Sequence, residues 1–275
     1  MQKHFGIVLM VDALGVSQYN IDECKQFLER QKELETCLVR LKEIFGEESQ
    51  HYKLSQTSIF GDTIVHCWPI TQKEKKDRFW ILGNAVSDAC EIVRWGLKNG
   101  ILFRGCIAIG DYISEKNTVL GPAIFDAHDW YESANWFGII FSPKAQLWIE
   151  AVFETQHRKK KKTQIDDLIE GELEKTILLY DVPLSHPFDS QDTKKFLTIG
   201  WPFSYYVQVE YSAWSLVGQG AEKTEETPRE ILLQQLFKIK ESKEGEPKYK
   251  NGIEFFDWYG KTVNYAKKVK TKGKK

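Results

Sequence analysis

Near the start of the chain, an apolar run typical of a strand is followed by apolar residues at helical spacing. This order of elements limits the folds that the chain can adopt. Residues 7–11 form a continuous apolar run typical of a buried strand, and a helical period follows over 21–45. Residues 53–60 and 63–68 then predict two strands. The Gly61-Asp62 pair between them predicts a two-residue hairpin turn.

A second helix and a fourth strand complete this half of the chain. Residues 78–99 repeat the helical period and end at Asn99-Gly100, and residues 101–109 alternate as a strand with two distinct faces. The resulting order is the split β-α-β arrangement of ferredoxin-like palms. We therefore predict an α+β fold, with an antiparallel sheet and helices on one face.

Two aspartates stand where this topology brings strands together. Asp12 directly follows the first apolar strand, and Asp62 lies at the hairpin tip. A carboxylate at the end of an apolar strand is costly unless a cation or ligand compensates it. The pair therefore predicts a divalent metal site, although an aspartate beside a glycine is also an ordinary turn former.

Composition excludes several classes of function. The 275 residues are 42% hydrophobic with a formal charge of −1, so a folded core is expected and no positive field attracts nucleic acid. No apolar run is long enough to cross a membrane, and the N-terminus lacks a signal-peptide pattern, so we expect a cytoplasmic protein. The five cysteines and six histidines show no zinc-type spacing, which favours oxygen ligands.

Four motifs together resemble class III nucleotide cyclases over about residues 5–142. They are VDALGVS around Asp12, FGDT around Asp62, FRGCIAIGD around Arg104, and VLGPAIFDAHDWYE around Gly121. The resemblance implies that two Mg²⁺ or Mn²⁺ ions position a nucleoside triphosphate in a homodimer with sites at the interface. It also implies that the ribose 3′-hydroxyl attacks the α-phosphorus and expels pyrophosphate.

The same resemblance assigns roles to individual residues. Asp12 and Asp62 would be metal ligands, with the Ala13 carbonyl as a further ligand. Arg104 would face the triphosphate, and the backbone amides of the following loop would cradle it, because a glycine lets such amides converge on phosphate. These loop residues are Leu14, Gly15, Val16 and Ser17.

Departures from typical class III cyclases point to a different base or to lost activity. Ser58 replaces the lysine four residues before the second aspartate, and Phe125 and Asp129 replace an asparagine and an arginine. The chain more closely resembles the pyrimidine cyclases of bacterial Pycsar antiphage systems, through A-x-x-x-x-E at 127–132 and the blocks TIGWP and NGIEFFDWY. UTP is favoured over CTP as substrate, giving cUMP or cCMP; a non-catalytic nucleotide-binding regulator and a divergent adenylate cyclase remain the alternatives.

Hydroxyl groups before the hairpin are candidates for reading a pyrimidine. Tyr52, Thr57 and Ser58 would offer hydroxyl partners to a uracil or cytosine edge, and a tyrosine would shrink a purine-sized pocket. Each of them is equally compatible with an ordinary strand position.

The second half of the sequence predicts an α/β extension rather than a separate unit. Residues 1–142 form the expected core, 143–266 an extension packed on it, and 267–275 a disordered basic tail with six lysines. Strands are expected over 171–182 and 196–201.

Overall fold

A computed structural model describes most of the chain. The described residues are 2–45, 50–71, 78–116, 118–159, 161–185, 193–203, 228–237 and 246–272. The strands are β1 (Gln2–Ala13), β2 (Gln56–Phe60), β3 (Thr63–Pro69), β4 (Phe103–Glu115), β5 (Thr118–Leu120), β6 (Gly138–Phe141), β7 (Ile177–Pro183) and β8 (Thr193–Ile199). The helices are η1 (Val16–Gln18), α1 (Ile21–Phe45), α2 (Gln50–Leu54), α3 (Arg78–Lys98), α4 (Pro122–Ser133), α5 (Pro143–His157), α6 (Gln164–Thr176), α9 (Pro228–Phe237) and α10 (Glu246–Lys272).

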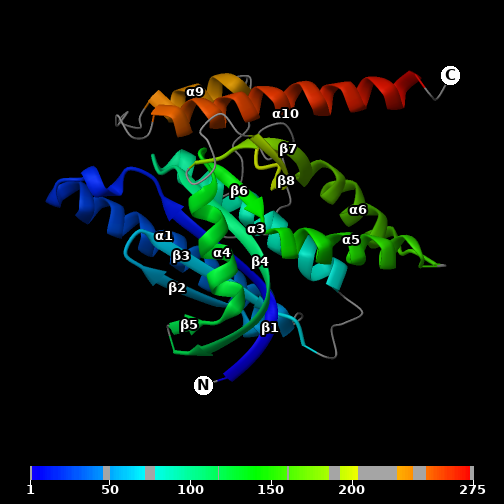
Figure 1. The fold of residues 1–275 in the computed structure, drawn as a ribbon, viewed down its shortest axis with the longest axis horizontal. Helices are drawn as coiled ribbons and strands as arrows, with labels where there is room; N and C mark the ends of the chain where they lie inside the picture. Colours follow the sequence, from blue (N-terminus) through cyan, green and yellow to red (C-terminus); the bar gives the residue numbers. More distant parts are fainter. Residues whose placement is uncertain are drawn as a thin grey trace.

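One sheet runs through the molecule and confirms the α+β prediction (Figure 1). Its strand order is β2-β3-β1-β4-β6-β8-β7, and β5 pairs with the end of β4. The first part follows the predicted order, with β1 antiparallel to both β3 and β4. β6 runs parallel to β4, so the sheet is mixed rather than purely antiparallel.

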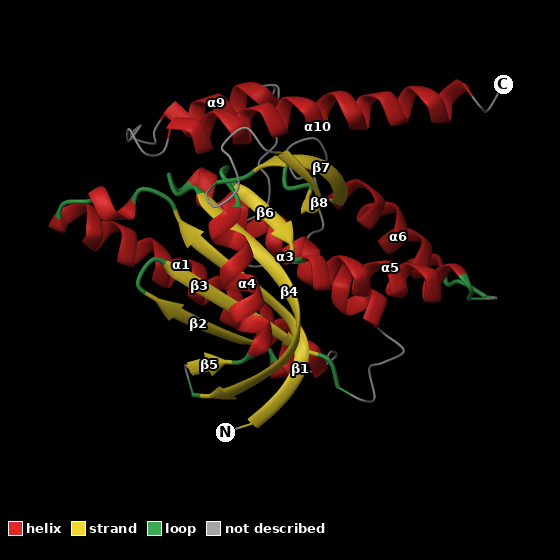
Figure 2. Ribbon diagram, viewed as in Figure 1, coloured by secondary structure: helices red, strands yellow, loops and turns green. Residues whose placement is uncertain are grey.

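Helices cover both faces of the sheet, which corrects the expectation that they lie on one. α3 packs behind β4, where a Cβ added to Gly96 would lie 2.6 Å from the Phe103 ring. α4 lies on the opposite face, where the Arg104 guanidinium sits 5.2 Å from the centre of the Tyr131 ring. Figure 2 shows α4 crossing in front of the strands. The central strands are therefore enclosed on two sides.

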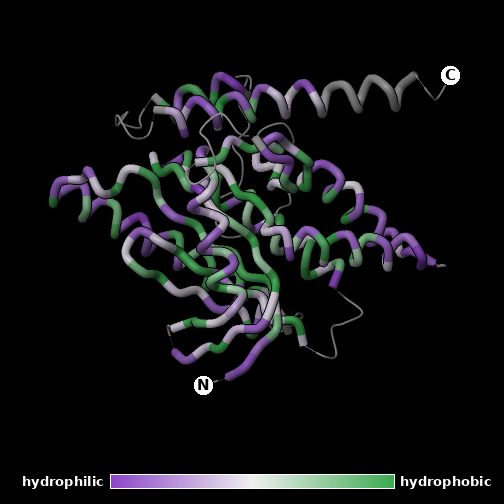
Figure 3. Tube along the Cα trace, viewed as in Figure 1, coloured by the Kyte–Doolittle hydropathy of each residue, from purple (hydrophilic) through white to green (hydrophobic). Residues whose placement is uncertain are grey.

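The core follows directly from the apolar strands. Ile7, Val8, Leu9 and Val11 are all buried to 1% exposure or less, which places both faces of β1 in the interior. A strand buried on both faces reads as a continuous apolar run, as observed here. Figure 3 shows hydrophobic residues following the strands through the middle of the molecule.

Two strand predictions begin too early. Residues 53 and 54 belong to α2, and β2 begins only at Gln56. Residues 171–176 lie in α6, which begins at a complete capping box between Thr163 and Asp166 and reaches Thr176 before β7 starts. In both places a helix end runs directly into a strand, so the apolar pattern shows no break.

The C-terminal residues extend the sheet rather than forming a separate layer. β6, β7 and β8 continue it beyond β4, and α10 packs its Phe255 ring 4.8 Å from that of Trp136. α10 continues to Lys272, into the stretch expected to be a disordered tail, and residues 273–275 lie outside the described part. No helix among the described residues is long and apolar enough to span a membrane.

Candidate active site

Asp12 stands at the centre of the candidate site, between two neighbouring strands. The register places it opposite Thr63 of β3 and Arg104 of β4. The Thr63 hydroxyl donates to Asp12 Oδ1 at 3.2 Å, and Arg104 donates through Nε and a terminal nitrogen to Oδ2, both at 3.2 Å. Only 13% of the Asp12 side chain is exposed. The carboxylate is therefore mostly shielded from solvent and already has a cationic partner.

The two aspartates lie close enough for their charges to interact. Burial raises the pKa of Asp12 most, and the charge of Asp62 raises it further, while Arg104 and Thr63 act in the opposite direction. The Asp62 carbonyl also accepts a hydrogen bond of 3.2 Å from the Ala13 amide, which ties the hairpin tip to the end of β1. The hairpin turn and the end of β1 thus bring the predicted pair together.

These oxygen donors suit a magnesium-type ion. Mg²⁺ is commonly held by one or two carboxylates together with waters and substrate phosphates, rather than by a full protein cage. Within the described ranges, no group of three or more histidine, cysteine, aspartate or glutamate side chains could hold a metal. The expected ligands are thus Asp12, Asp62 and the Ala13 carbonyl, and in this structure Asp12 is paired with Arg104.

The loop after Asp12 offers some of the expected backbone donors. Gly15 has φ of 81°, a left-handed conformation that glycine adopts without strain, and the first hydrogen bond of η1 runs from Gln18 to Gly15. The amides of Gly15, Val16 and Ser17 precede that bond, as at any helix start. The Leu14 amide instead donates to the Leu102 carbonyl at 2.8 Å, so it is committed to the fold.

Only one of the three candidate base-reading residues lies on the side of the sheet that carries Asp12. We call that side, with Asp12, Ser58, Thr63 and Arg104, the Asp12 face, because register pairing and strand alternation place these side chains together. Ser58 is 2% exposed, and its hydroxyl is buried without a hydrogen-bond partner. Ser58 thus shares a side of the sheet with Asp12, and its role in reading a base stays a prediction.

The other two candidates point elsewhere. Thr57 faces the opposite side of β2, where its hydroxyl lies 2.8 Å from His66 Nδ1. Tyr52 belongs to α2 rather than to a strand, is 6% exposed, and hydrogen-bonds Asp88 of α3 at 3.3 Å. Burial and the neighbouring Asp88 raise the pKa of Tyr52. Neither hydroxyl is placed to meet a base beside Asp12.

Tyr131 is part of the site and was not found from the sequence. It is 5% exposed on α4, and its ring lies beneath the Arg104 guanidinium. Burial raises the pKa of Tyr131, and the charge of Asp12 adds to this effect. The helical period could have placed Tyr131 on the buried side of α4, but nothing in the sequence pairs it with Arg104. Phe125 and Asp129 lie on the exposed side of the same helix.

Comparison with known proteins finds similar solved structures, all at low sequence identity. No family model and no curated protein matches the chain. The adenylyl cyclase CyaB from P. aeruginosa aligns over 72% of this chain and 95% of its own, at 11% identity and a TM-score of 0.39. The adenylate/guanylate cyclase/hydrolase from Silicibacter pomeroyi aligns over 72% and 98%, at 16% identity and a TM-score of 0.35. Identities and TM-scores this low assign no activity to this chain.

Proposed function

We propose that the chain is a nucleotide cyclase that converts UTP, or CTP, into the 3′,5′-cyclic monophosphate and pyrophosphate. The observation that carries the proposal is the meeting of Asp12 and Asp62, whose like charges interact at the end of buried strands. Two adjacent carboxylates repel one another unless a cation joins them. A second messenger made in this way would serve antiphage defence, in keeping with the resemblance to Pycsar cyclases.

The proposal gives each residue of the candidate site a role. Asp12, Asp62 and the Ala13 carbonyl would hold two Mg²⁺ or Mn²⁺ ions, which would neutralise charge on the triphosphate. The amides of Gly15, Val16 and Ser17 bind phosphate oxygens. Arg104, freed from Asp12, stabilises negative charge that develops on the phosphates.

The pyrimidine preference rests on Ser58. A lysine at this position of the Asp12 face would bring a cation and three extra carbons, whereas serine brings one small hydroxyl. Because that hydroxyl is buried without a partner, a uracil or cytosine edge would satisfy it. We further propose a homodimer, with two equivalent sites formed at the interface between chains.

A second candidate function follows from the ion pair at Asp12. Arg104 occupies the carboxylate that a metal would need, and Phe125 and Asp129 are exposed. Such a site suits a non-catalytic regulator that binds a nucleotide without turnover. Metal-dependent nucleotide binding that yields no product would favour this reading.

Incubation with each of the four ribonucleoside triphosphates tests the proposal. The purified chain is mixed with Mn²⁺ or Mg²⁺, and cyclic products are measured by mass spectrometry. We expect cUMP or cCMP from the wild type and none from Asp62→Asn. A product from ATP alone would identify a divergent adenylate cyclase, and binding without any product would identify the regulator.

A further inference from the structure

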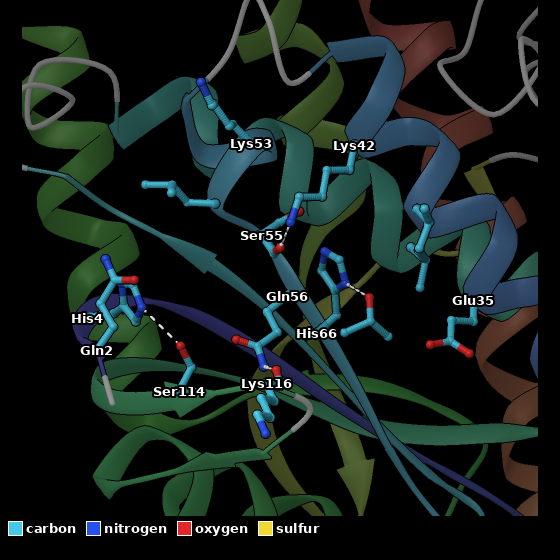
Figure 4. Close-up of a pocket in the computed structure, with 14 residues that line it drawn as sticks. Gln2, His4, Glu35, Lys42, Lys53, Ser55, Gln56, His66, Ser114 and Lys116 are labelled. Carbon is cyan, nitrogen blue, oxygen red and sulfur yellow. Dashed lines mark hydrogen bonds between the residues drawn. The ribbon is translucent and has the colours of Figure 1, made fainter.

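A cavity lies at the end of the β2–β3 hairpin that is remote from the Gly61-Asp62 turn. It has a volume of about 400 Å³, is open to solvent on one side, and is lined by α1, α2 and the ends of several strands (Figure 4). Thr57 and His66 line it, and both project from the side of β2 and β3 opposite Ser58. A cavity of this volume is large enough for a small organic ligand.

The charged residues lining this cavity are mostly positive. Three lysines, Lys42, Lys53 and Lys116, face a single acid, Glu35. In the part of the chain that the structure describes, none of these lysines forms an ion pair. Unpaired positive charge in a concave, partly enclosed space attracts anions.

Lys42 and His66 present their polar groups to the same space. The Lys42 ammonium donates to the Ser55 carbonyl at 2.8 Å, and Figure 4 shows it beside the His66 ring. Burial lowers the pKa of His66 to about 3, and the charge of Lys42 contributes, so the imidazole is neutral. When the Thr57 hydroxyl donates to Nδ1, His66 carries its proton on Nε2. The cavity then presents an ammonium from Lys42 and an imidazole N–H from His66, both hydrogen-bond donors.

We propose that this cavity binds a small molecule bearing an oxyanion, a phosphate or a carboxylate, with Lys42 as its main charged partner. The lysines at the rim, Lys53 and Lys116, add attraction through long side chains that can reorient toward the ligand. His66 and Thr57 supply neutral polar contacts at the floor. This site is separate from the proposed cyclase site, because the β1 residues that line it, Gln2 and His4, lie at the opposite end of that strand from Asp12.

Isothermal titration of the full chain with pyrophosphate and with citrate tests the proposal. Divalent ions are removed beforehand with a chelating resin, so they cannot bring pyrophosphate to Asp12. We expect saturable binding of at least one probe. Tighter binding of pyrophosphate would indicate phosphate recognition, and tighter binding of citrate would indicate carboxylate recognition. Asp12→Asn should bind the probe as the wild type does.

Charge reversal inside and outside the cavity provides the matched comparison. Lys42→Glu should raise the dissociation constant of the probe at least about tenfold. Lys261→Glu, on the exposed surface of α10, should leave it within about twofold of the wild-type value. Lys53 is exposed at the rim, so Lys53→Glu should not disturb folding, and it should raise the dissociation constant about threefold. Absence of binding by both probes below about 1 mM, or equal binding by Lys42→Glu and Lys261→Glu, would overturn the proposal.

Discussion

The same strands carry opposite chemistry on their two faces. On the Asp12 face, Asp12 and Asp62 gather negative charge beside Arg104, and the unpaired hydroxyl of Ser58 lies on the same face. On the other face, His66 is buried and neutral beside Lys42. Because successive side chains of a strand alternate in direction, adjacent residues such as Thr57 and Ser58 serve different sites. Position in the sequence is therefore a poor guide to which site a strand residue joins.

Removal of the Asp12 carboxylate should have the largest effect. Asp12→Asn keeps a hydrogen-bond acceptor for Arg104 but loses the charge that would hold a metal ion. We expect turnover of UTP to fall roughly 1000-fold, about 4 kcal/mol of transition-state stabilisation. Thr57→Val, on the opposite face, is the control and should change the rate less than about threefold. Steady-state kinetics with Mn²⁺ would measure both, and equal losses would break the distinction between the faces.

Arg104→Met should leave a buried carboxylate without its counter-charge. Both partners of the Arg104–Asp12 pair are less than a fifth exposed, at 16% and 13%. We expect the free energy of unfolding to fall by about 3 kcal/mol, measured by urea denaturation. Mn²⁺ should restore more stability to this variant than to the wild type, because the arginine no longer competes for Asp12.

The exposed pair between Arg158 and Glu154 provides the control for that experiment. Its side chains are 80% and 68% exposed, so Arg158→Met should change stability by less than about 1 kcal/mol. If Arg104→Met were as stable as Arg158→Met, the pair at Asp12 would not be the buried interaction described here.

His66 should make stability depend on pH. Its pKa falls from 6.5 to about 3 on folding, so the unfolded chain binds more protons between those values and stability is lost as the pH falls. Between pH 7 and pH 5 the loss from this group should be about 2 kcal/mol. Urea denaturation of His66→Gln at both pH values should show a correspondingly smaller loss. Identical losses in the two proteins would mean that His66 is not held neutral.

Ser58→Ala should give the smallest effect, with opposite signs in two measurements. Removal of an unpartnered buried hydroxyl should raise the free energy of unfolding by about 1 kcal/mol, while kcat/KM for UTP falls about tenfold. Ser55→Ala is the control, because the Ser55 hydroxyl already donates to the Tyr52 carbonyl at 2.7 Å. That variant should lose about 1 kcal/mol of stability. Destabilisation by both substitutions would show that Ser58 has a partner.

The sequence predicted the first half of the fold well because its apolar periods change at turns. Gly61-Asp62 and Asn99-Gly100 mark the ends of elements, and β1 is buried on both faces, as its apolar run indicates. Prediction was wrong where no turn residue separates a helix from a strand, as at residues 53–56 and 171–177. The parallel pairing of β6 with β4 joins distant parts of the chain and has no local signal.

The candidate site shows the same division between local and distant information. Asp12 could be found because it lies at the end of an apolar strand and Asp62 because it lies in a hairpin turn, and the topology then predicted that they approach. The stacking of Arg104 on Tyr131 could not be found, since it depends on how α4 crosses the sheet. Thr57 and Ser58 could not be separated until the register of β2 on β3 fixed their faces.

Mn²⁺ binding measured by electron paramagnetic resonance tests the central claim most directly. The purified chain is titrated with Mn²⁺ in the presence of a UTP analogue that cannot be cyclised. If Asp12 and Asp62 form the proposed centre, the wild type binds two Mn²⁺ ions per site, and both Asp12→Asn and Asp62→Asn lose them. Equal Mn²⁺ binding by the wild type and the two variants would contradict the account.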